Sequence, residues 1–451
     1  MESGQQFVRK DLLQYKSAPN LTLNDQIKSA IAKGATIYHL AFGQSPFPVI
    51  PAAQTALAQR VAEKDYEPTC GIEALRQAIC DYHRRVDGIE VSSENTIVGP
   101  GSKSLLFLLF LVFEGDIFLL SPSWTTYHPQ CLLSRKKPII VQASSQTEWK
   151  LTPQALEKVY PKPFCVSSEN GRFSMQALAC LSSGTPKLLV FNNPNNPTGI
   201  VYTEEELKAL CHVFRRNNVL VLSDEIYARF HFANDHHCLA KFYPDGTIVA
   251  NGISKWAGAG GWRIGYLLFP PSLGSLKKAV EGAASHSYSS ASAPIQYASI
   301  EMFKPSDDID DYVKHARRIL CSLADYCYRE LTSVGVEIVK PQGGFYMFPD
   351  FEVVRPYLRR KKAASGDKMC ALILQEASVA LLAGGPAFLR PTEELTVRLC
   401  YTHFDGAKAL LESRAAGLEN CLTDEFLSAH CSLTVKGIEA LKSWVIRARE
   451  S

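Results

Sequence analysis

A single lysine stands in an unusual setting at residues 251–266, which read NGISKWAGAGGWRIGY. Lys255 has mostly small and apolar neighbours there, and Arg263 follows it closely. A lysine that is held away from water has a lowered pKa, so more of it is the neutral amine. A neutral amine can bond a carbonyl carbon as a nucleophile or take a proton as a base. The setting of Lys255 therefore predicts a reactive lysine.

Other polar residues follow short runs rich in Val, Ile and Leu. The run VLVLSDE (219–225) places Asp224 at the end of an apolar strand, with Tyr227 shortly after it. The run KLLVFNN (187–193) leads into PNNPTG, which contains Asn196. Open α/β sheets bind ligands at the carboxyl ends of their parallel strands. Taken singly, these residues are also typical of a helix cap, an ion pair or a surface turn. Together with Lys255 they predict one pocket.

A glycine turn adds a second kind of binding group. NTIVGPGSKS (95–104) predicts a strand, a glycine turn and the start of a helix. Backbone N–H groups at such a turn, with the helix dipole behind them, can bind a phosphate. Gly101, Ser102 and Lys103 are therefore candidate phosphate contacts, although a glycine turn without a ligand explains the residues about equally well.

The elements that position these residues alternate between apolar strands and helices. Strands are predicted at 95–101, 116–122, 137–143, 187–193, 219–225, 247–252 and 263–270. A helix is predicted at 203–217, where Thr203 and Glu206 form a capping box. Strands that are apolar on both faces and separated by helices indicate an α/β domain with a mainly parallel sheet.

The pattern changes after about residue 300. A long charged helix at 308–335 precedes a few strands and further helices. We expect a large domain at 46–302, a smaller α+β domain at 303–451, and an N-terminal arm at 1–45 that folds back on the small domain. The apolar spacing of the C-terminal tail predicts an extra helix packed on the same domain.

Composition excludes several classes of protein. The chain has 451 residues, is 46% hydrophobic and carries a net charge of +3, which does not favour nucleic-acid binding through phosphate contacts. The longest apolar run, LLFLLFLVF, is too short to span a bilayer. The 13 cysteines form no CxxC pair or His/Cys cluster, which favours reduced thiols and no metal site. With acidic residues and no apolar segment at the N-terminus, these features predict a cytoplasmic protein without a membrane or nucleic-acid partner.

Several motifs resemble those of one enzyme family. NNPTG, SDEIY, SKWAGAGGWRIGY and VRLCY, preceded by YEPTCGIEALRQAI, resemble the class I aminotransferases in order and spacing over about residues 35–405. The likeness is to the bacterial-type aspartate and prephenate aminotransferase subgroup. It implies fold type I with a seven-stranded sheet, pyridoxal 5′-phosphate (PLP) as cofactor, and a homodimer with shared active sites. It also implies ping-pong transfer of an amino group from an L-amino acid to a 2-oxo acid.

The resemblance assigns catalytic roles to residues already singled out. Lys255 would hold PLP as a Schiff base and move the proton between substrate and cofactor. Asp224 would pair with the pyridine nitrogen and keep it protonated. Tyr227 and Asn196 would donate hydrogen bonds to the ring oxygen.

The remaining cofactor contacts follow from the same resemblance. Arg263 would bind the phosphate together with the glycine turn, and Ser254 belongs to the same site. Trp124 in SPSWTTY would stack on the ring, although an ordinary core tryptophan is the alternative. Tyr66 in DYEPTCG would reach across the dimer to the partner's phosphate.

Substrate contacts are implied as well. Arg398 in VRLCY would bind the α-carboxylate, with Asn196 and the backbone at Gly43 beside it. Lys103 resembles the lysine that meets a distal carboxylate, which favours an acidic donor such as aspartate or glutamate. Lys103 could instead turn to the phosphate, and aromatic or large neutral donors are the next choice.

Two other kinds of protein share these motifs. A PLP-dependent lyase, racemase or cyclising synthase of the same fold would use the same cofactor contacts. A cofactor-binding protein that has lost activity is the third alternative. The presence of Lys255, Asp224 and Arg398 argues against this last reading.

Overall fold

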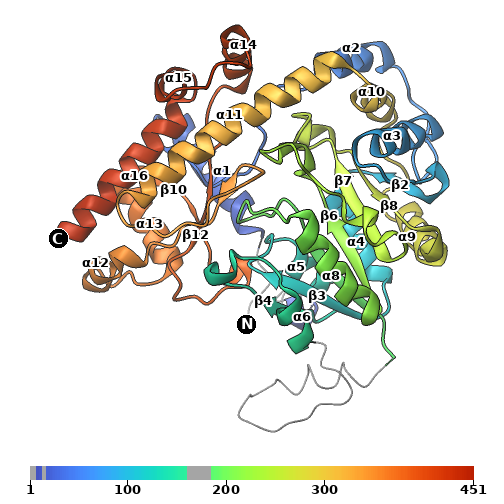
Figure 1. Ribbon diagram of the computed structural model, residues 1–451, viewed down its shortest axis with the longest axis horizontal. Helices are drawn as coiled ribbons and strands as arrows, with labels where there is room; N and C mark the ends of the chain where they lie inside the picture. The colour runs from blue at the N-terminus through green and yellow to red at the C-terminus, as the bar shows by residue number, and fades with distance from the viewer. Residues whose placement is uncertain (1–6, 13–16, 160–183) are drawn as a thin grey trace.

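The largest element of the computed structural model, which describes residues 7–12, 17–159 and 184–451, is a seven-stranded sheet (Figure 1). Its strand order is β2-β8-β7-β6-β5-β3-β4, and only β8 runs antiparallel to its neighbours. The strands are β2 (Thr96–Gly99), β3 (Asp116–Ser121), β4 (Ile139–Gln142), β5 (Lys187–Asn192), β6 (Val219–Asp224), β7 (Thr247–Gly252) and β8 (Gly265–Leu268). The predicted mainly parallel sheet is confirmed.

Both faces of this sheet are buried because its strands are apolar on both sides. In β5, Leu188 and Val190 pack in one hydrophobic cluster, whereas Leu189 and Phe191 pack in another. The first cluster includes α4, α5 and α9, and the second includes α6 and α8. The helices of this part of the chain are α2 (Pro51–Arg60), α3 (Glu73–Val86), α4 (Ser102–Val112), α5 (Tyr127–Leu133), α6 (Pro153–Val159), α8 (Glu204–Arg216), α9 (Gly274–Ser285) and α10 (Ala293–Phe303).

Register brings the carboxyl ends of the central strands together. Asn192 at the end of β5 is aligned with Asp224 at the end of β6, and Asp224 is aligned with Ala250 of β7. Lys255 follows β7 after a short turn. These ends form the edge of the sheet on which the polar residues were expected to meet.

Local signals explain where two elements begin. The Thr203 hydroxyl accepts a hydrogen bond from Glu206 N, and the Glu206 carboxylate accepts one from Thr203 N at 2.8 Å, so the capping box of α8 is confirmed. The strand predicted at 263–270 begins only at Gly265, because Arg263 has a left-handed backbone with φ 60°.

The C-terminal part carries two small sheets and most of the remaining helices, as Figure 1 shows. One sheet has the order β11-β12-β9, and the other pairs β1 with β10 in parallel. Their strands are β1 (Tyr38–His39), β9 (Tyr346–Met347), β10 (Val379–Ala380), β11 (Leu382–Ala383) and β12 (Val397–Cys400). The helices are α1 (Pro19–Ala32), α11 (Asp307–Thr332), α12 (Arg355–Arg360), α13 (Gly366–Ala377), α14 (Gly406–Ala416), α15 (Asp424–His430) and α16 (Ser432–Glu450).

Both ends of the chain contribute to this C-terminal part. In the arm, β1 pairs with β10, while residues 1–6 and 13–16 lie outside the described residues. In the tail, α16 buries Ile438, Leu441 and Trp444, and the Trp444 indole donates to Glu376 at 2.8 Å. The tail therefore packs as its apolar spacing predicts.

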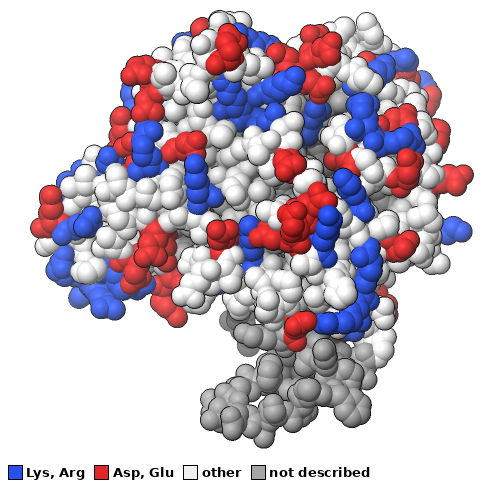
Figure 2. Space-filling model, viewed as in Figure 1, with Lys and Arg blue, Asp and Glu red and all other residues white. Residues whose placement is uncertain are grey.

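The surface carries charges of both signs. Figure 2 shows acidic and basic side chains interspersed over the visible face, with a basic cluster near α12, whose last turn contains Arg359 and Arg360. Among the helices in the described part of the chain, none is both long enough and apolar enough to cross a membrane.

Candidate active site

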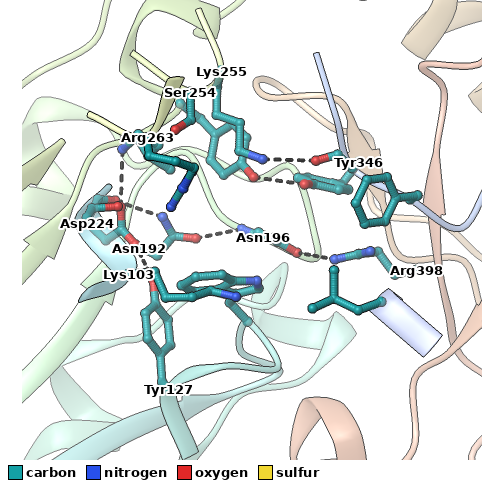
Figure 3. Close-up of a pocket in the computed structure, with 17 residues that line it drawn as sticks. Lys103, Tyr127, Asn192, Asn196, Asp224, Ser254, Lys255, Arg263, Tyr346 and Arg398 are labelled. Atoms are coloured by element: carbon teal, nitrogen blue, oxygen red, sulfur yellow. Dashed lines mark hydrogen bonds between the residues drawn. The ribbon is translucent and has the colours of Figure 1, made fainter. Parts of the chain in front are cut away.

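A cavity of about 420 Å³ lies at the carboxyl edge of the large sheet and extends to β9 and β12 (Figure 3). Most of the residues predicted from sequence line it, whereas Gly101 and Tyr66 do not. The predicted residues in its wall are Gly43, Ser102, Lys103, Trp124, Asn196, Asp224, Tyr227, Ser254, Lys255, Arg263 and Arg398. The cavity is therefore lined by residues that lie far apart in the sequence, from Gly43 to Arg398.

Lys255 is partly buried, and its ammonium group has a single hydrogen-bond partner in the described residues. Nζ donates to the carbonyl oxygen of Gly43 at 2.9 Å. Burial, together with the positive charges of Arg398 and Lys103, lowers the pKa of Lys255 to about 8. A substantial fraction of this lysine is therefore a neutral amine near pH 8.

Asp224 supplies the one carboxylate among the described residues that line the cavity. Its side chain is 3% exposed, and burial raises its pKa to about 6. The Tyr127 hydroxyl donates to Oδ2 at 2.6 Å, and the backbone N–H of Ile226 donates to Oδ1 at 3.3 Å. A buried carboxylate in this state is suited to a cationic partner that enters the cavity.

A chain of hydrogen bonds joins Asp224 to Arg398 across the cavity. Asn192 Nδ2 donates to the Asp224 carbonyl at 2.7 Å, and Asn196 N donates to Asn192 Oδ1 at 2.7 Å. Arg398 Nη1 in turn donates to Asn196 Oδ1 at 3.3 Å. Figure 3 shows both asparagines between Asp224 and Arg398. With Oδ1 occupied, the Nδ2 group of Asn196 remains a donor without a partner among the described residues.

Arg398 is a buried cation without a counterion among the described residues. Its side chain is 1% exposed, Nη2 donates to the Ala41 carbonyl at 2.8 Å, and Nε has no hydrogen-bond partner. In the described part of the chain, no carboxylate lies within 4.0 Å of its guanidinium. Burying a charge without a partner is costly, so this geometry favours binding of an external anion.

A second cationic corner surrounds the glycine turn. Arg263 donates from Nη1 to the Gly260 carbonyl at 2.8 Å, and the backbone of Gly101 lies against its guanidinium. Gly101 has φ 84°, and a Cβ there would lie 2.1 Å from Arg263 Nη2, so only glycine fits. Ser102 begins α4, whose N-terminal N–H groups also favour an anion.

Lys103 and Trp124 form one side wall. The Lys103 ammonium lies 5.2 Å from the centroid of a Trp124 ring, within the range of a cation–π contact. Burial lowers the pKa of Lys103, and the charge of Arg263 adds to this effect. No carboxylate of the described residues pairs with Lys103, so its charge is available inside the cavity.

Tyr66 lies away from the cavity of its own chain. Its side chain is 92% exposed, which is unusual for a tyrosine. Its ring makes no hydrogen bond or ring contact with the described residues, and its exposure leaves it accessible to another molecule.

Three polar residues of the pocket were not predicted: Tyr127, Asn192 and Tyr346. Tyr127 follows Trp124 closely in SPSWTTY, and Asn192 lies at the carboxyl end of the strand predicted at 187–193. The sequence positions of both residues were therefore a signal for the site. Tyr346, in GGFYM, stands among apolar residues typical of a core strand. Leu21, Phe42 and Ile226 complete the wall.

Comparison with known proteins agrees with this geometry. Residues 35–409 match the family "Aminotransferase class I and II". An aspartate aminotransferase of Bacillus sp. (strain YM-2) is 31% identical over 394 residues, covering 84% of this chain and 91% of that protein. A probable aspartate/prephenate aminotransferase of Aquifex aeolicus is 30% identical over 389 residues, covering 83% and 91%.

Solved structures show the same architecture. The aspartate aminotransferase of Thermus thermophilus with maleate superimposes with a TM-score of 0.76 at 26% identity, covering 90% of this chain and 97% of that one. Aminotransferases of this family use PLP, act on amino acids and 2-oxo acids, and are typically homodimers. By its sequence, its fold and its pocket, the chain belongs to the class I and II aminotransferases.

Proposed function

We propose that this PLP-dependent aminotransferase takes its amino group from an acidic amino acid such as aspartate or glutamate and passes it to a 2-oxo acid. The observation that carries the proposal is the charge of the cavity, whose described wall holds four cationic side chains and one carboxylate. The cations are Lys103, Lys255, Arg263 and Arg398. After one phosphate and one α-carboxylate are bound, Lys103 remains for a second carboxylate.

The pocket offers groups that suit three parts of PLP: its phosphate, its flat ring and the polar atoms of that ring. The corner of Arg263, Ser102 and the Gly101 backbone suits a phosphate, because it combines a guanidinium with a helix N-terminus. Ser254 would add a hydroxyl there, and Trp124 a flat face for the ring. Bound there, PLP supplies an aldehyde that bonds amines and a ring that accepts electrons when a Cα proton leaves.

Asp224 would hold a proton on the ring nitrogen. Its buried carboxylate, oriented by Tyr127, favours a cationic partner. Tyr227 and the free Nδ2 of Asn196 would donate to the ring oxygen. These three residues would thus fix both polar edges of the ring.

Lys255 would hold the aldehyde carbon and afterwards carry the Cα proton. Its pKa of about 8 lies close to the pH at which a general base works efficiently. Because Nζ already lies 2.9 Å from the Gly43 carbonyl, its amine would stand beside the backbone that borders the α-carboxylate site.

Arg398 would bind the α-carboxylate. Its orphaned Nε and the absence of a counterion among described residues support this role. A carboxylate can accept two parallel hydrogen bonds from a guanidinium, which would orient the Cα–H bond. Lys103, on the opposite wall, would then meet the distal carboxylate of an acidic donor.

The active site would be shared between two subunits, as the resemblance implies. Tyr66 would reach the phosphate of the partner, which its 92% exposure supports. We also propose an arm at 1–45, a large domain at 46–302 and a small domain at 303–451. Free thiols throughout the described part of the chain support a cytoplasmic location.

The proposal is tested by adding single amino acids to the PLP-loaded enzyme without a 2-oxo acid. A ping-pong aminotransferase releases one equivalent of 2-oxo acid per active site and no ammonia, and aspartate or glutamate should act at the lowest concentration. Continuous ammonia release would indicate a lyase. Efficient use of aromatic donors alone would refute the acidic preference.

A matched pair of lysine variants tests the role of Lys103. Lys103→Met should raise the KM for aspartate by about 10- to 100-fold, because a partly buried ion pair is lost. The kcat/KM for a neutral donor such as alanine should change less than about threefold by the same reasoning. The exposed Lys278→Met serves as the control. Equal losses with both donors would assign Lys103 to the phosphate instead.

A further inference from the structure

Two tyrosine hydroxyls from different sheets meet in the pocket. Tyr227 Oη, after β6, lies 2.8 Å from Tyr346 Oη, on β9. The two side chains are 3% and 1% exposed. The Tyr227–Tyr346 bond is the only hydrogen bond that either hydroxyl makes within the described residues.

The number of protons limits which hydrogen bonds the two hydroxyls can donate. Each phenol has one proton, and burial raises both pKa values, so both hydroxyls stay protonated at working pH. One hydroxyl must donate to the other, and the second proton is then free. If Tyr346 donates, the free proton belongs to Tyr227. An acceptor oxygen placed beside Tyr227 selects this arrangement.

The Tyr346 hydroxyl is held in place from several sides. A Cβ on residue 43 would lie 1.9 Å from Oη, so the chain passes close by only because that residue is glycine. The ring centroid lies 4.9 Å from the Arg398 guanidinium, and β9 pairs with β12, which carries Arg398. The ring also meets that of Tyr227 edge to face, at 86°. Little room remains for the hydroxyl to turn away.

We propose that Tyr346 is a positioning residue whose hydroxyl donates to Tyr227 and so directs the Tyr227 proton onto the ring oxygen of the cofactor. This inference rests on the proposed contact between Tyr227 and that oxygen. A phenol that accepts a hydrogen bond becomes a stronger donor through its own proton. Tyr346 therefore strengthens the bond that Tyr227 makes, although it does not itself touch the reacting atoms.

This arrangement has a spectroscopic consequence. The protonated nitrogen of the Lys255–cofactor linkage and the Tyr227 hydroxyl compete for one ring oxygen. A stronger Tyr227 bond therefore lowers the pKa of that nitrogen. The charged and titratable groups that face the pair are Arg398, Asp224, Lys255 and Cys400, and a tyrosine-to-phenylalanine change leaves all of them in place.

The test is a pH titration of the absorption band of the PLP-loaded enzyme without substrate. Tyr346→Phe should raise the midpoint by about half a pKa unit, and Tyr227→Phe by more than about one unit. In a Tyr227→Phe background, Tyr346→Phe should add no further shift. Tyr202→Phe removes a buried hydroxyl outside the pocket, one that accepts from Leu151 N, and should leave the midpoint unchanged.

Each result of this titration supports or refutes the positioning role of Tyr346. An unchanged midpoint in Tyr346→Phe, or an equal shift with and without the Tyr227 hydroxyl, would refute the proposed action of Tyr346 through Tyr227. If Tyr346→Phe does not retain the cofactor, Gly43→Ala displaces the same hydroxyl without removing it and should raise the midpoint likewise. Absence of a lysine-linked band in the wild-type enzyme would refute the proposed function as well. A normal wild-type band, with the same midpoint in the variants, would refute only the positioning role of Tyr346.

Discussion

Replacing Asp224 by asparagine should stabilise the cofactor-free protein while it removes the ring-nitrogen partner. Burial raises the pKa of this carboxyl from 3.8 to about 6 in the folded state. Below pH 3.8 both folded and unfolded states bind the proton, so ionisation has no effect. As the pH rises toward 6, the unfolded state ionises first, and the folded state loses stability. Asparagine has the same shape: its Oδ1 can accept from Ile226 N, and its Nδ2 can donate to the Tyr127 hydroxyl, so both contacts are kept without a charge.

The magnitude follows from the difference of about two pKa units, at about 1.4 kcal/mol for each unit. Asp224→Asn should therefore raise the free energy of unfolding by about 1 kcal/mol at pH 4.5 and by about 3 kcal/mol at pH 7.5. Urea unfolding of both cofactor-free proteins at the two pH values measures this gain.

Asp87→Asn is a control with the opposite sign. Burial acts to raise the pKa of Asp87, but the hydrogen bond and charge of His83 hold it below the usual value. Its ionisation therefore stabilises the fold above pH 4, and Asp87→Asn should destabilise the protein there. An Asp224→Asn protein that is no more stable than wild type, or whose gain is the same at both pH values, would refute the reasoning.

Three further outcomes are expected. Arg398→Lys should lower kcat/KM for aspartate by about 10²- to 10³-fold, because lysine cannot donate two parallel hydrogen bonds to a carboxylate. Steady-state kinetics measures this loss, and a loss of less than about tenfold would contradict the assignment. Lys255→Ala should abolish the absorption band of the lysine-linked cofactor, and its persistence would disprove the linkage. Thr203→Ala should cost about 1 kcal/mol of stability by urea unfolding through loss of the α8 cap, with kcat unchanged; a lower kcat would mean that the cap also shapes the pocket.

Much of the fold could be predicted because the buried strands and one helix cap have local sequence signals. The run 219–225 became β6, and the Thr203–Glu206 box begins α8 where expected. The start of β8 was wrong by two residues, because the left-handed backbone of Arg263 leaves no periodic signal. Strand order was set by pairing between distant segments, which hydrophobic patterns do not encode.

The site was predictable only where charge or amide groups follow strands. Asp224, Lys255 and Asn196 stood out because polar residues in apolar surroundings require an explanation. Tyr127 and Tyr346 did not, since a tyrosine among apolar residues resembles any core aromatic. Their partners are distant in the sequence: Tyr127 and Asp224 are 97 positions apart, and Tyr346 and Tyr227 are 119 positions apart. The cross-subunit role of Tyr66 remains a prediction.

The bond from Arg398 to the Ala41 carbonyl joins residues 357 positions apart. Asp224, by contrast, ends β6 and Lys255 follows β7, and these two strands are neighbours in both sequence and space. A chain growing from the ribosome thus completes the edge that carries Asp224 and Lys255 while the strand bearing Arg398 is still untranslated. We expect that a nascent chain can bind its cofactor before its last strands are synthesised, whereas substrate binding requires those strands.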